Sequence, residues 1–232
     1  MDTLHSGMSA SHPIFGNLHK ELAHEFNDKR HIRFYKKKQA LYYEGNPVIG
    51  VYFIQSGRGK VYKTGPEGKQ YILRLANPQD VLGLESIFNP IPYFSSTAEM
   101  VEEGWVHLIE KQTILKLLAK DYTLALNLMT SLAAQIVSGD DERVDLAQRA
   151  VRERMARLLV TLSQNYGTKI KTGIRLSLKL SREDIAEMIG TAAESAIRLL
   201  SEFREEKIIG VEGKDIIILD EARLVRVANL NI

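Results

Sequence analysis

The sequence predicts an α+β chain with three parts. These are an N-terminal antiparallel β-roll, which is a jelly-roll-like double-stranded β-helix, then one long helix, and a C-terminal winged helix-turn-helix. Three observations lead to this prediction. Short apolar stretches separated by glycine turns fill the first half, a long proline-free segment follows, and two helix-start patterns flank a glycine near the C-terminus. We expect the roll over residues 1–121, the long helix over 122–149 and the helix-turn-helix domain over 150–232.

The predicted roll rests on short strands with turn signals about ten residues apart. Gly45, Gly57 and Gly83 lie at turn positions, where glycine adopts backbone angles that other residues avoid. Residues 41–46 are expected to form a strand and then a turn, and the other expected strands cover residues 50–57, 59–63, 70–75 and 105–109.

A proline-free segment from residue 122 to about residue 147 predicts the long helix. Leu124, Leu126 and Leu128 widen its apolar face and are expected to cover the roll. Gly139 marks an expected bend or hinge, since glycine costs about 1 kcal/mol relative to alanine inside a helix. A second set of residues recurs every three and four positions, which favours a homodimer seam over a helix packed only on its own domain. The seam residues are Met129, Leu132, Ile136, Gly139 and Arg143.

The helix-turn-helix is predicted from two capping-box patterns on either side of Gly190. Ser181-x-x-Asp184 and Thr191-x-x-Glu194 each place a hydroxyl and an acid three residues apart, so that both can bind free backbone N–H groups at a helix start. The first helix is expected to end near Ile189, and the second can then enter the major groove of DNA. Before these two helices, a helix over 151–166 and a strand over 174–180 are expected.

The second helix of the pair has two distinct faces at about 100° per residue. Arg198 lies one turn after Glu194 on the outer face; arginine can bind guanine and glutamate can accept from cytosine. The alternative is an ordinary ion pair between the two on a solvated helix. The expected inner face comprises Ala196, Leu199, Leu200 and Phe203, and the outer face Glu194, Arg198, Ser201 and Glu205.

A β-hairpin follows directly and predicts the wing. Strand-like segments 207–211 and 215–219 are separated by a short turn over 212–214. Lys214 at the tip is either a phosphate contact or a solvated turn lysine.

With these features the chain resembles the Crp/Fnr family of bacterial transcription regulators over nearly its whole length. The segment Glu194-Ser195-Ala196-Ile197-Arg198 matches the recognition helix of that family. The resemblance implies a homodimer on a near-palindromic double-stranded operator, with Arg198 on guanine and Glu194 on the opposite strand of a TGA-like half-site. RNA polymerase is the further partner implied.

The recognition helix also departs from the family pattern. Relatives often carry Ser-Arg or Thr-Val before the glutamate, whereas this chain has Ala192-Ala193, so the outer base of the half-site stays open. Ile197 can either touch a thymine methyl group or pack. The residues predicted to contact DNA are Ser181, Arg182, Thr191, Glu194, Ser195, Ile197, Arg198 and Lys214.

The roll is similar to the cyclic-nucleotide-binding domain of the same family, whose phosphate cassette has Gly-Glu followed later by Arg-Ser/Thr-Ala. Here Thr97-Ala98 matches, but Ser96 stands at the arginine position and the acid falls one residue late, at Glu85. No Arg or Lys lies between Arg74 and Lys111, so a buried cyclic phosphate would lack its cation, which argues against cyclic AMP. The predicted effector pocket comprises Gly83, Leu84, Glu85, Ser86, Ser96 and Thr97.

Haem is the alternative effector, since some relatives bind it for gas sensing. His107 and Met100 are its candidate ligands. No metal-finger spacing occurs among the early histidines, and the sequence has no cysteine, which excludes thiolate iron–sulfur clusters and disulfides. No metal site is therefore predicted.

Composition supports a cytoplasmic protein of ordinary globular type. The net charge is +2, so DNA binding would depend on the placement of charges and not on their excess. We find neither an apolar run of membrane-spanning length nor a signal-peptide core. An enzyme is not expected because no set of nucleophile and base is tied together by a motif. A ligand-binding module with little DNA specificity is the other alternative, although such a module would not need residues 181–219.

Overall fold

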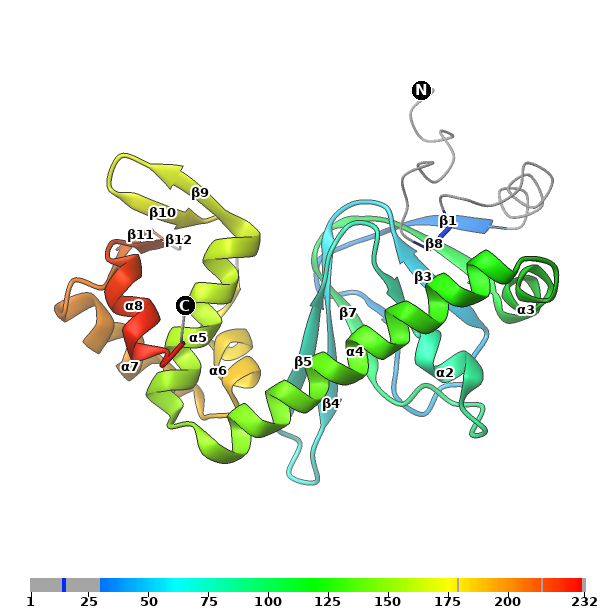
Figure 1. Cartoon of the computed structure of the whole chain (residues 1–232), viewed down its shortest axis with the longest axis horizontal. Helices are drawn as coiled ribbons and strands as arrows, with labels where there is room; N and C mark the ends of the chain where they lie inside the picture. The colour runs from blue at the N-terminus through cyan, green and yellow to red at the C-terminus, as the bar shows by residue number, and fades with distance from the viewer. Residues whose placement is uncertain (1–13, 16–29, 179, 214, 231–232) are drawn as a thin grey trace. The chain divides into compact units, whose positions relative to one another are not determined.

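The computed structural model describes residues 14–15, 30–178, 180–213 and 215–230 (Figure 1). The chain forms two compact units. The roll unit comprises residues 1–63 and 73–139, and the C-terminal unit comprises residues 64–72 and 140–232.

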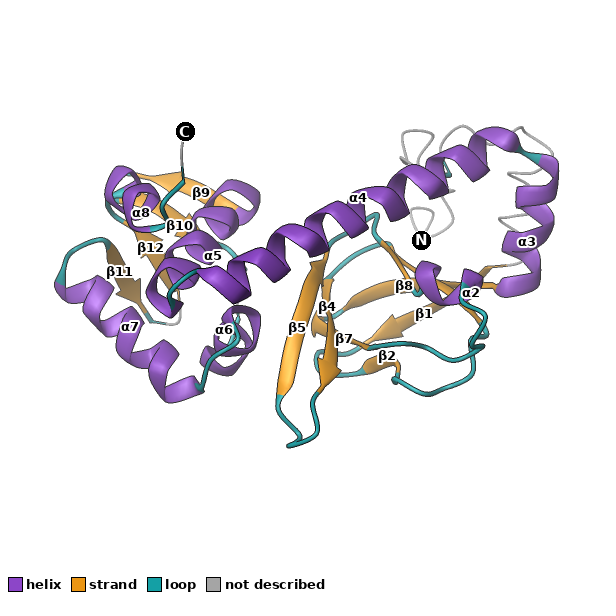
Figure 2. Ribbon diagram, turned by 60° about the horizontal axis from the view of Figure 1, so that its bottom comes forward, coloured by secondary structure: helices purple, strands orange, loops and turns teal. Residues whose placement is uncertain are grey.

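The roll unit contains two four-stranded sheets, which confirms the predicted antiparallel β-roll (Figure 2). One sheet has the strand order β1-β8-β3-β6, and the other has the order β2-β7-β4-β5. The strands are β1 Arg30–Tyr35, β2 Ala40–Tyr42, β3 Gly50–Ile54, β4 Arg58–Thr64, β5 Gln70–Ala76, β6 Val81–Leu82, β7 Thr97–Glu102 and β8 Gly104–Glu110. Of these, β1, β6 and β7 were not predicted.

Strand β3 shows why its sheet is covered on both faces. Val51 and Phe53 belong to a core shared with helices, whereas Tyr52 and Ile54 belong to a second core shared with the other sheet. Successive side chains of a strand point to opposite faces, so a strand buried on both sides is a continuous apolar run. All five residues of β3 are buried accordingly.

Three helices cover the outer face of the β1-β8-β3-β6 sheet: α2 Leu84–Phe88, α3 Lys111–Lys120 and α4 Tyr122–Gln148. Helix α4 matches the predicted long helix. Leu124 and Leu128 are 1% and 2% exposed and pack into this core, but Leu126 is 47% exposed, so its predicted contact with the roll is wrong. Helix α4 also continues through Gly139 without a break.

The C-terminal unit holds the predicted winged helix-turn-helix. Its helices are α5 Val151–Tyr166, α6 Arg182–Ile189, α7 Ala193–Glu205 and α8 Glu221–Val227, and its sheet has the order β11-β12-β10-β9. The strands are β9 Gly167–Ile170, β10 Gly173–Leu176, β11 Ile209–Glu212 and β12 Asp215–Ile218. Helix α5 has the predicted bounds, whereas α8 and strand β9 were missed.

Two strand predictions in this unit require correction. The strand expected over 174–180 ends at Leu176, where it pairs with β9 in a hairpin. The first wing strand begins at Ile209 and not at Lys207, because Lys207 has a left-handed φ of 57° and the N–H of Ile208 still bonds to the carbonyl of Phe203 in α7.

The sequence also predicts a helix over about residues 17–27; this segment and the early histidines before His31 lie outside the described residues. Within the described part of the chain, none of the helices combines the length and the apolar character needed to span a bilayer.

Candidate DNA-binding and effector sites

The first capping box forms as predicted at the start of α6. The Ser181 hydroxyl accepts from the Asp184 N–H at 3.0 Å, and Asp184 Oδ2 accepts from the Ser181 N–H at 3.0 Å. Each group satisfies a donor that the helix leaves free. This reciprocal pair fixes where α6 begins.

The turn between the two helices is closed by Gly190 and by an arginine from α5. Gly190 has a left-handed φ of 62°, and its N–H bonds to the Ala186 carbonyl. Arg154 Nε donates to the Ile189 carbonyl at 2.8 Å, and its Nη1 atom donates to the Arg149 carbonyl at 2.7 Å. The Arg154 guanidinium thus binds two carbonyl groups, one at the end of α6 and one just before the start of α5.

The second capping box does not form, which corrects the prediction for Thr191. Helix α7 begins at Ala193 with Ala192 as its cap residue, and no side chain caps it. The reason lies in the preceding turn, where the Thr191 N–H bonds to the Ala186 carbonyl at 3.0 Å and so still closes α6. The chain therefore needs one further extended residue before α7 can start.

Helix α7 buries one face and exposes the other as predicted. Ala196, Leu199, Leu200 and Phe203 are each at most 8% exposed, whereas Glu194 and Arg198 are exposed. The Arg198 side chain is 74% exposed, and its Nε atom lies 3.8 Å from Glu202 Oε1. Within the described helix, Arg198 thus faces Glu202 and not Glu194. Glu194 and Arg198 therefore do not form the ion pair that was the alternative interpretation.

The other predicted DNA contacts occupy different environments. Ile197 is 47% exposed on the same outer face, while Ser195 and Arg182 are half-buried. Ser201, expected on the outer face but not as a DNA contact, is half-buried, and its hydroxyl donates to the Ile197 carbonyl at 3.1 Å within the same helix. Lys214 lies outside the described residues.

An ionic network holds α7 against α5 and α8. Arg152 of α5 donates to Glu202 at 3.2 Å and to Glu206 at 2.6 Å, and its guanidinium lies 4.6 Å from the centre of the Phe203 ring. Arg223 of α8 donates to Glu206 at 2.8 Å. These contacts leave the outer face of α7 open and fix its direction within the unit.

The predicted effector cassette surrounds the start of α2 in the roll unit. Gly83 has a left-handed φ of 79°, and a Cβ atom there would lie 2.7 Å from a carbon of the Phe94 ring. Leu84 packs into the core beneath the helices. Thr97 Oγ1 accepts from the Glu44 N–H at 3.0 Å. The Leu84 and Thr97 side chains therefore have structural roles.

The remaining cassette residues leave buried polar atoms without partners among the described residues. These atoms are Glu85 Oε2 and Ser86 Oγ. Burial raises the pKa of Tyr42, the Glu85 carboxylate raises it further, and Arg74 and Ser96 lower it. The effect of Ser96 is that of a side-chain hydrogen bond, so the Tyr42 hydroxyl has a partner, unlike Glu85 Oε2 and Ser86 Oγ. Unpaired buried polar groups of this kind are uncommon in folded proteins.

Arg74 is a candidate effector-site residue that the sequence analysis did not identify. It lines a cavity of about 460 Å³ together with Gln79 and Asp80, opposite a row of polar side chains on α4. No sequence signal places Arg74 beside α4, because strand β5 and helix α4 line the same cavity only in the fold. The α4 side chains that line the cavity are Asn127, Thr130, Ser131, Ala134, Gln135 and Ser138.

The two candidate haem ligands are both buried inside the roll. Met100 is fully buried in the core between the two sheets. His107 Nε2 lies 2.7 Å from Gln55 Oε1, and the ring packs edge-on against Phe53. Burial, and to a smaller extent Arg30, lower the pKa of His107 to about 4. The described residues include no group of three or more His, Asp or Glu side chains that could hold a metal ion.

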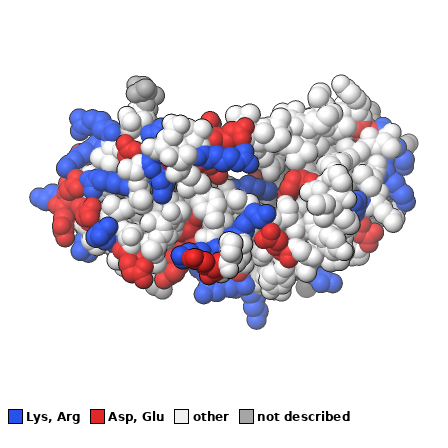
Figure 3. Space-filling view, turned by 90° about the horizontal axis from the view of Figure 1, so that it is seen from below, with Lys and Arg blue, Asp and Glu red and all other residues white. Residues whose placement is uncertain are grey.

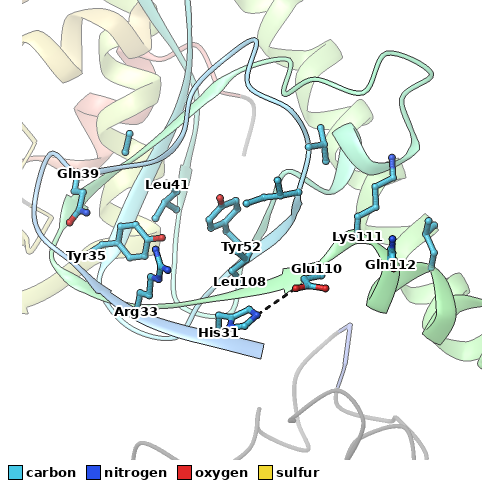
Figure 4. A pocket seen from close by; sticks show the side chains of 14 residues that line it. His31, Arg33, Tyr35, Gln39, Leu41, Tyr52, Leu108, Glu110, Lys111 and Gln112 are labelled. Atoms are coloured by element: carbon cyan, nitrogen blue, oxygen red, sulfur yellow. Dashed lines mark ion pairs between the residues drawn. The ribbon is translucent and has the colours of Figure 1, made fainter. Parts of the chain in front are cut away.

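A second, open groove lies between strands β1, β2 and β8 of the roll unit (Figure 4). Leu41, Tyr52 and Leu108 form part of its apolar floor, and Arg33 stands at its rim beside Tyr35. The His31 Nε2 atom lies 3.6 Å from Glu110 Oε1 across its edge. The predicted effector residues do not line this groove.

Helix α4 carries an exposed apolar strip in place of part of the predicted seam. Met129 and Ile136 are 55% and 64% exposed, and Leu126 and Val137 extend the strip. Leu132, by contrast, is partly buried against the core of its own unit. Gly139 is half-buried and Arg143 is exposed; the Arg143 guanidinium pairs with Asp140 one turn earlier.

Two family models match this chain. A Crp-like helix-turn-helix domain matches residues 153–227, and a cyclic nucleotide-binding domain matches residues 32–121. The CRP-like cAMP-activated global transcriptional regulator of Mycobacterium tuberculosis is 29% identical over 192 residues, covering 83% of this chain and 85% of that protein. The anaerobic regulatory protein of Bacillus subtilis is 27% identical over 206 residues, covering 89% of this chain and 85% of its own length.

Solved structures share the fold. FixK2 from Bradyrhizobium japonicum superposes with a TM-score of 0.76 at 24% identity, covering 88% of this chain and 99% of that structure. A CRP-family regulator from Thermus thermophilus gives a TM-score of 0.73 at 25% identity, with 85% and 97% covered. These relatives are regulators, in agreement with the prediction that the chain is not an enzyme. The chain belongs to the Crp/Fnr family of DNA-binding transcription regulators.

Proposed function

We propose that the chain acts as a homodimer in the cytoplasm and reads a near-palindromic operator with one α7 helix from each subunit. The observation that carries this proposal is the outer face of α7, where Glu194 and Arg198 are exposed and not paired with each other. An exposed guanidinium can donate two hydrogen bonds to guanine, and a carboxylate can accept from cytosine. These pairings favour a TGA-like half-site.

Other residues position the helix or extend the contact. Ser181 and Thr191 flank the ends of α6, so their roles in DNA binding are contacts to the phosphate backbone through the helix start and the turn. Arg182, Ser195 and Lys214 are further proposed backbone contacts. Ile197 is exposed beside Arg198, which favours contact with a thymine methyl group over packing within the protein.

The homodimer is proposed to form along α4. Exposed apolar residues spaced by three and four positions are typical of helix pairs, since each such row can pack against its symmetric copy. Leu126, Met129 and Ile136 fit this pattern, together with Arg143 further along, whereas Leu132 is engaged within its own subunit. Two subunits would present their α7 helices to half-sites about one helical turn apart.

An effector in the roll unit is proposed to set the activity, and transcription would follow through contact with RNA polymerase. The cassette keeps its turn at Gly83 and its buried polar atoms at Glu85 and Ser86, which supports a ligand there. We do not propose haem, because Met100 and His107 are engaged in the core of the roll.

Binding-site selection from random duplex DNA tests this function. We expect enrichment of two inverted TGA-containing half-sites centred about 10 base pairs apart, and binding of two chains per duplex in sedimentation analysis. Enrichment of a single unrepeated site, or of no sequence at all, would refute the dimeric reader and favour a ligand-binding module with little DNA specificity.

A further inference from the structure

We propose that the open groove of the roll unit binds a free carboxylate that carries an apolar body, such as a fatty acid in solution. The groove is lined by residues of strands β1, β2 and β8 and of the start of helix α3, and its volume is about 990 Å³ (Figure 4). None of the predicted effector residues lines it. The groove is therefore a separate site, and a ligand there goes beyond the proposed reading of DNA.

The floor of the groove is the inner face of one sheet. His31 of β1 lies opposite Leu108 of β8, which lies opposite Tyr52 of β3. Residues directly opposite each other in antiparallel strands point to the same face, and Tyr52 and Leu108 belong to the core between the two sheets. Arg33 and Tyr35 follow His31 at intervals of two residues, so they share this face.

This inner face stays open because the strand opposite it is short. Strand β1 has six residues, whereas β2, the edge strand of the other sheet, has three. Two large apolar side chains of the groove are consequently in contact with solvent: Ile49 is 55% and Leu115 is 42% exposed. An apolar body lying along the groove would remove this surface from water, which is favourable.

One end of the groove carries donors and positive charge. Arg33, Tyr35 and Gln39 lie together there (Figure 4). The Gln39 Oε1 atom already accepts from the Lys36 N–H at 3.0 Å, so the amide NH2 group of Gln39 is left to donate. No acid of the described part of the chain forms an ion pair with Arg33. A guanidinium can donate two parallel hydrogen bonds to one carboxylate.

The other end of the groove is less suited to an anion. Lys111 and Gln112 line it, but the Glu110 carboxylate lies beside them and faces His31 Nε2 at 3.6 Å (Figure 4). A second negative group at this end would be repelled by Glu110. The charges therefore favour a ligand with a single acidic head at Arg33 and an apolar body along the floor.

Calorimetric titration of the full chain with two probes tests this proposal. Decanoate and decyltrimethylammonium carry apolar chains of the same length and heads of opposite charge, and both are used below the concentration at which they form micelles. We expect saturable binding of decanoate at one site per chain. The cationic probe should bind roughly tenfold more weakly or worse, because it gains no charge-assisted hydrogen bonds at Arg33.

Two variants separate the head site from the apolar floor. Arg33→Gln should weaken decanoate binding by roughly tenfold or more without weakening the cationic probe. Leu115→Ser should weaken both probes, because it removes apolar surface that both chains cover. Both residues are exposed, and thermal unfolding checks that the variants fold. Lys116→Gln is the matched control, since Lys116 is exposed on α3 outside the groove lining, and it should bind decanoate as the unchanged chain does.

Three results would overturn the proposal: no saturable binding of decanoate, equal affinity for the two probes, or equal loss in Arg33→Gln and Lys116→Gln. A change of mass in Arg33→Gln without any decanoate binding would show instead that a second copy of the chain covers the groove. Operator binding is measured separately without decanoate, and Arg33→Gln should keep the full base preference. Failure of the carboxylate site is thereby distinguished from failure of operator recognition.

Discussion

At the scale of single residues, burial decides which polar groups stabilise the fold and which remain available to bind a ligand or DNA. His107 is 1% exposed, hydrogen-bonded to Gln55 and packed on Phe53. Its pKa is lowered to about 4 by burial first and by Arg30 second. The ring is therefore neutral near pH 7, while the same histidine in the unfolded chain titrates at about 6.5.

The roll unit should consequently lose stability as the pH falls from about 6.5 towards 4. In this interval the unfolded chain binds a proton that the folded chain does not, so the free energy of unfolding rises with pH. The His107 contribution is on the order of 2–3 kcal/mol. Urea unfolding of the unchanged chain and of His107→Gln at pH 7 and pH 4.5 measures it; equal pH dependence in the two proteins would contradict the assignment.

A side chain caps the start of α6 but not the start of α7, and this difference gives a second prediction at the residue scale. Ser181→Ala removes a cap that accepts from the Asp184 N–H and should lower the stability of the C-terminal unit by about 1 kcal/mol. Thr191→Ala is the matched control, because Thr191 does not cap α7, and should cost less than about 0.5 kcal/mol. Thermal unfolding followed by circular dichroism compares them, and a larger loss for Thr191→Ala would show that the second cap forms after all.

At the scale of elements, the spacing of apolar residues was sufficient to predict a helix and its buried face wherever the helix has one clear apolar face. The bounds of α5 and the inner face of α7 followed from the sequence because packing against neighbours selects the same residues as the pattern. Strand β6 has two residues, too few for any period to be visible. Leu126 and Leu132 exchanged their expected roles because a helix pattern does not reveal which of two apolar rows meets its own core.

The exposed strip on α4 predicts the consequence of one charged substitution. Ile136 is 64% exposed within its own chain, so Ile136→Glu should leave the fold of the subunit intact. In a paired α4 it would place two buried carboxylates together, a disruption of several kcal/mol. Light scattering should give the mass of one chain for Ile136→Glu and twice that mass for the unchanged protein.

Thr123→Glu is the control for that experiment, because Thr123 is exposed on α4 and lies outside the strip. It should leave the mass at two chains. A two-chain mass for Ile136→Glu as well would place the dimer interface elsewhere.

At the scale of the whole molecule, the placement of charges matters more than their sum. The net charge is +2, and Figure 3 shows Lys and Arg interspersed with Asp and Glu on the face that it draws. Such a surface offers little non-specific attraction to DNA, so affinity has to come from positioned groups. That the chain is a DNA-binding regulator could be predicted from the sequence, because the helix-turn-helix pattern lies within one continuous segment. The cavity that Arg74 lines could not, because it depends on how strand β5 and helix α4 meet in the fold.

The most direct test of the account is the base preference of the Arg198→Ala variant, measured by fluorescence anisotropy on the selected operator and on its single-base-pair variants. The account predicts a loss of about 1–3 kcal/mol of discrimination at one symmetric base pair of each half-site. The control Arg204→Ala removes an equal charge from the last turn of the same helix and should keep the full preference. Undiminished discrimination by Arg198→Ala at every base pair would contradict the account.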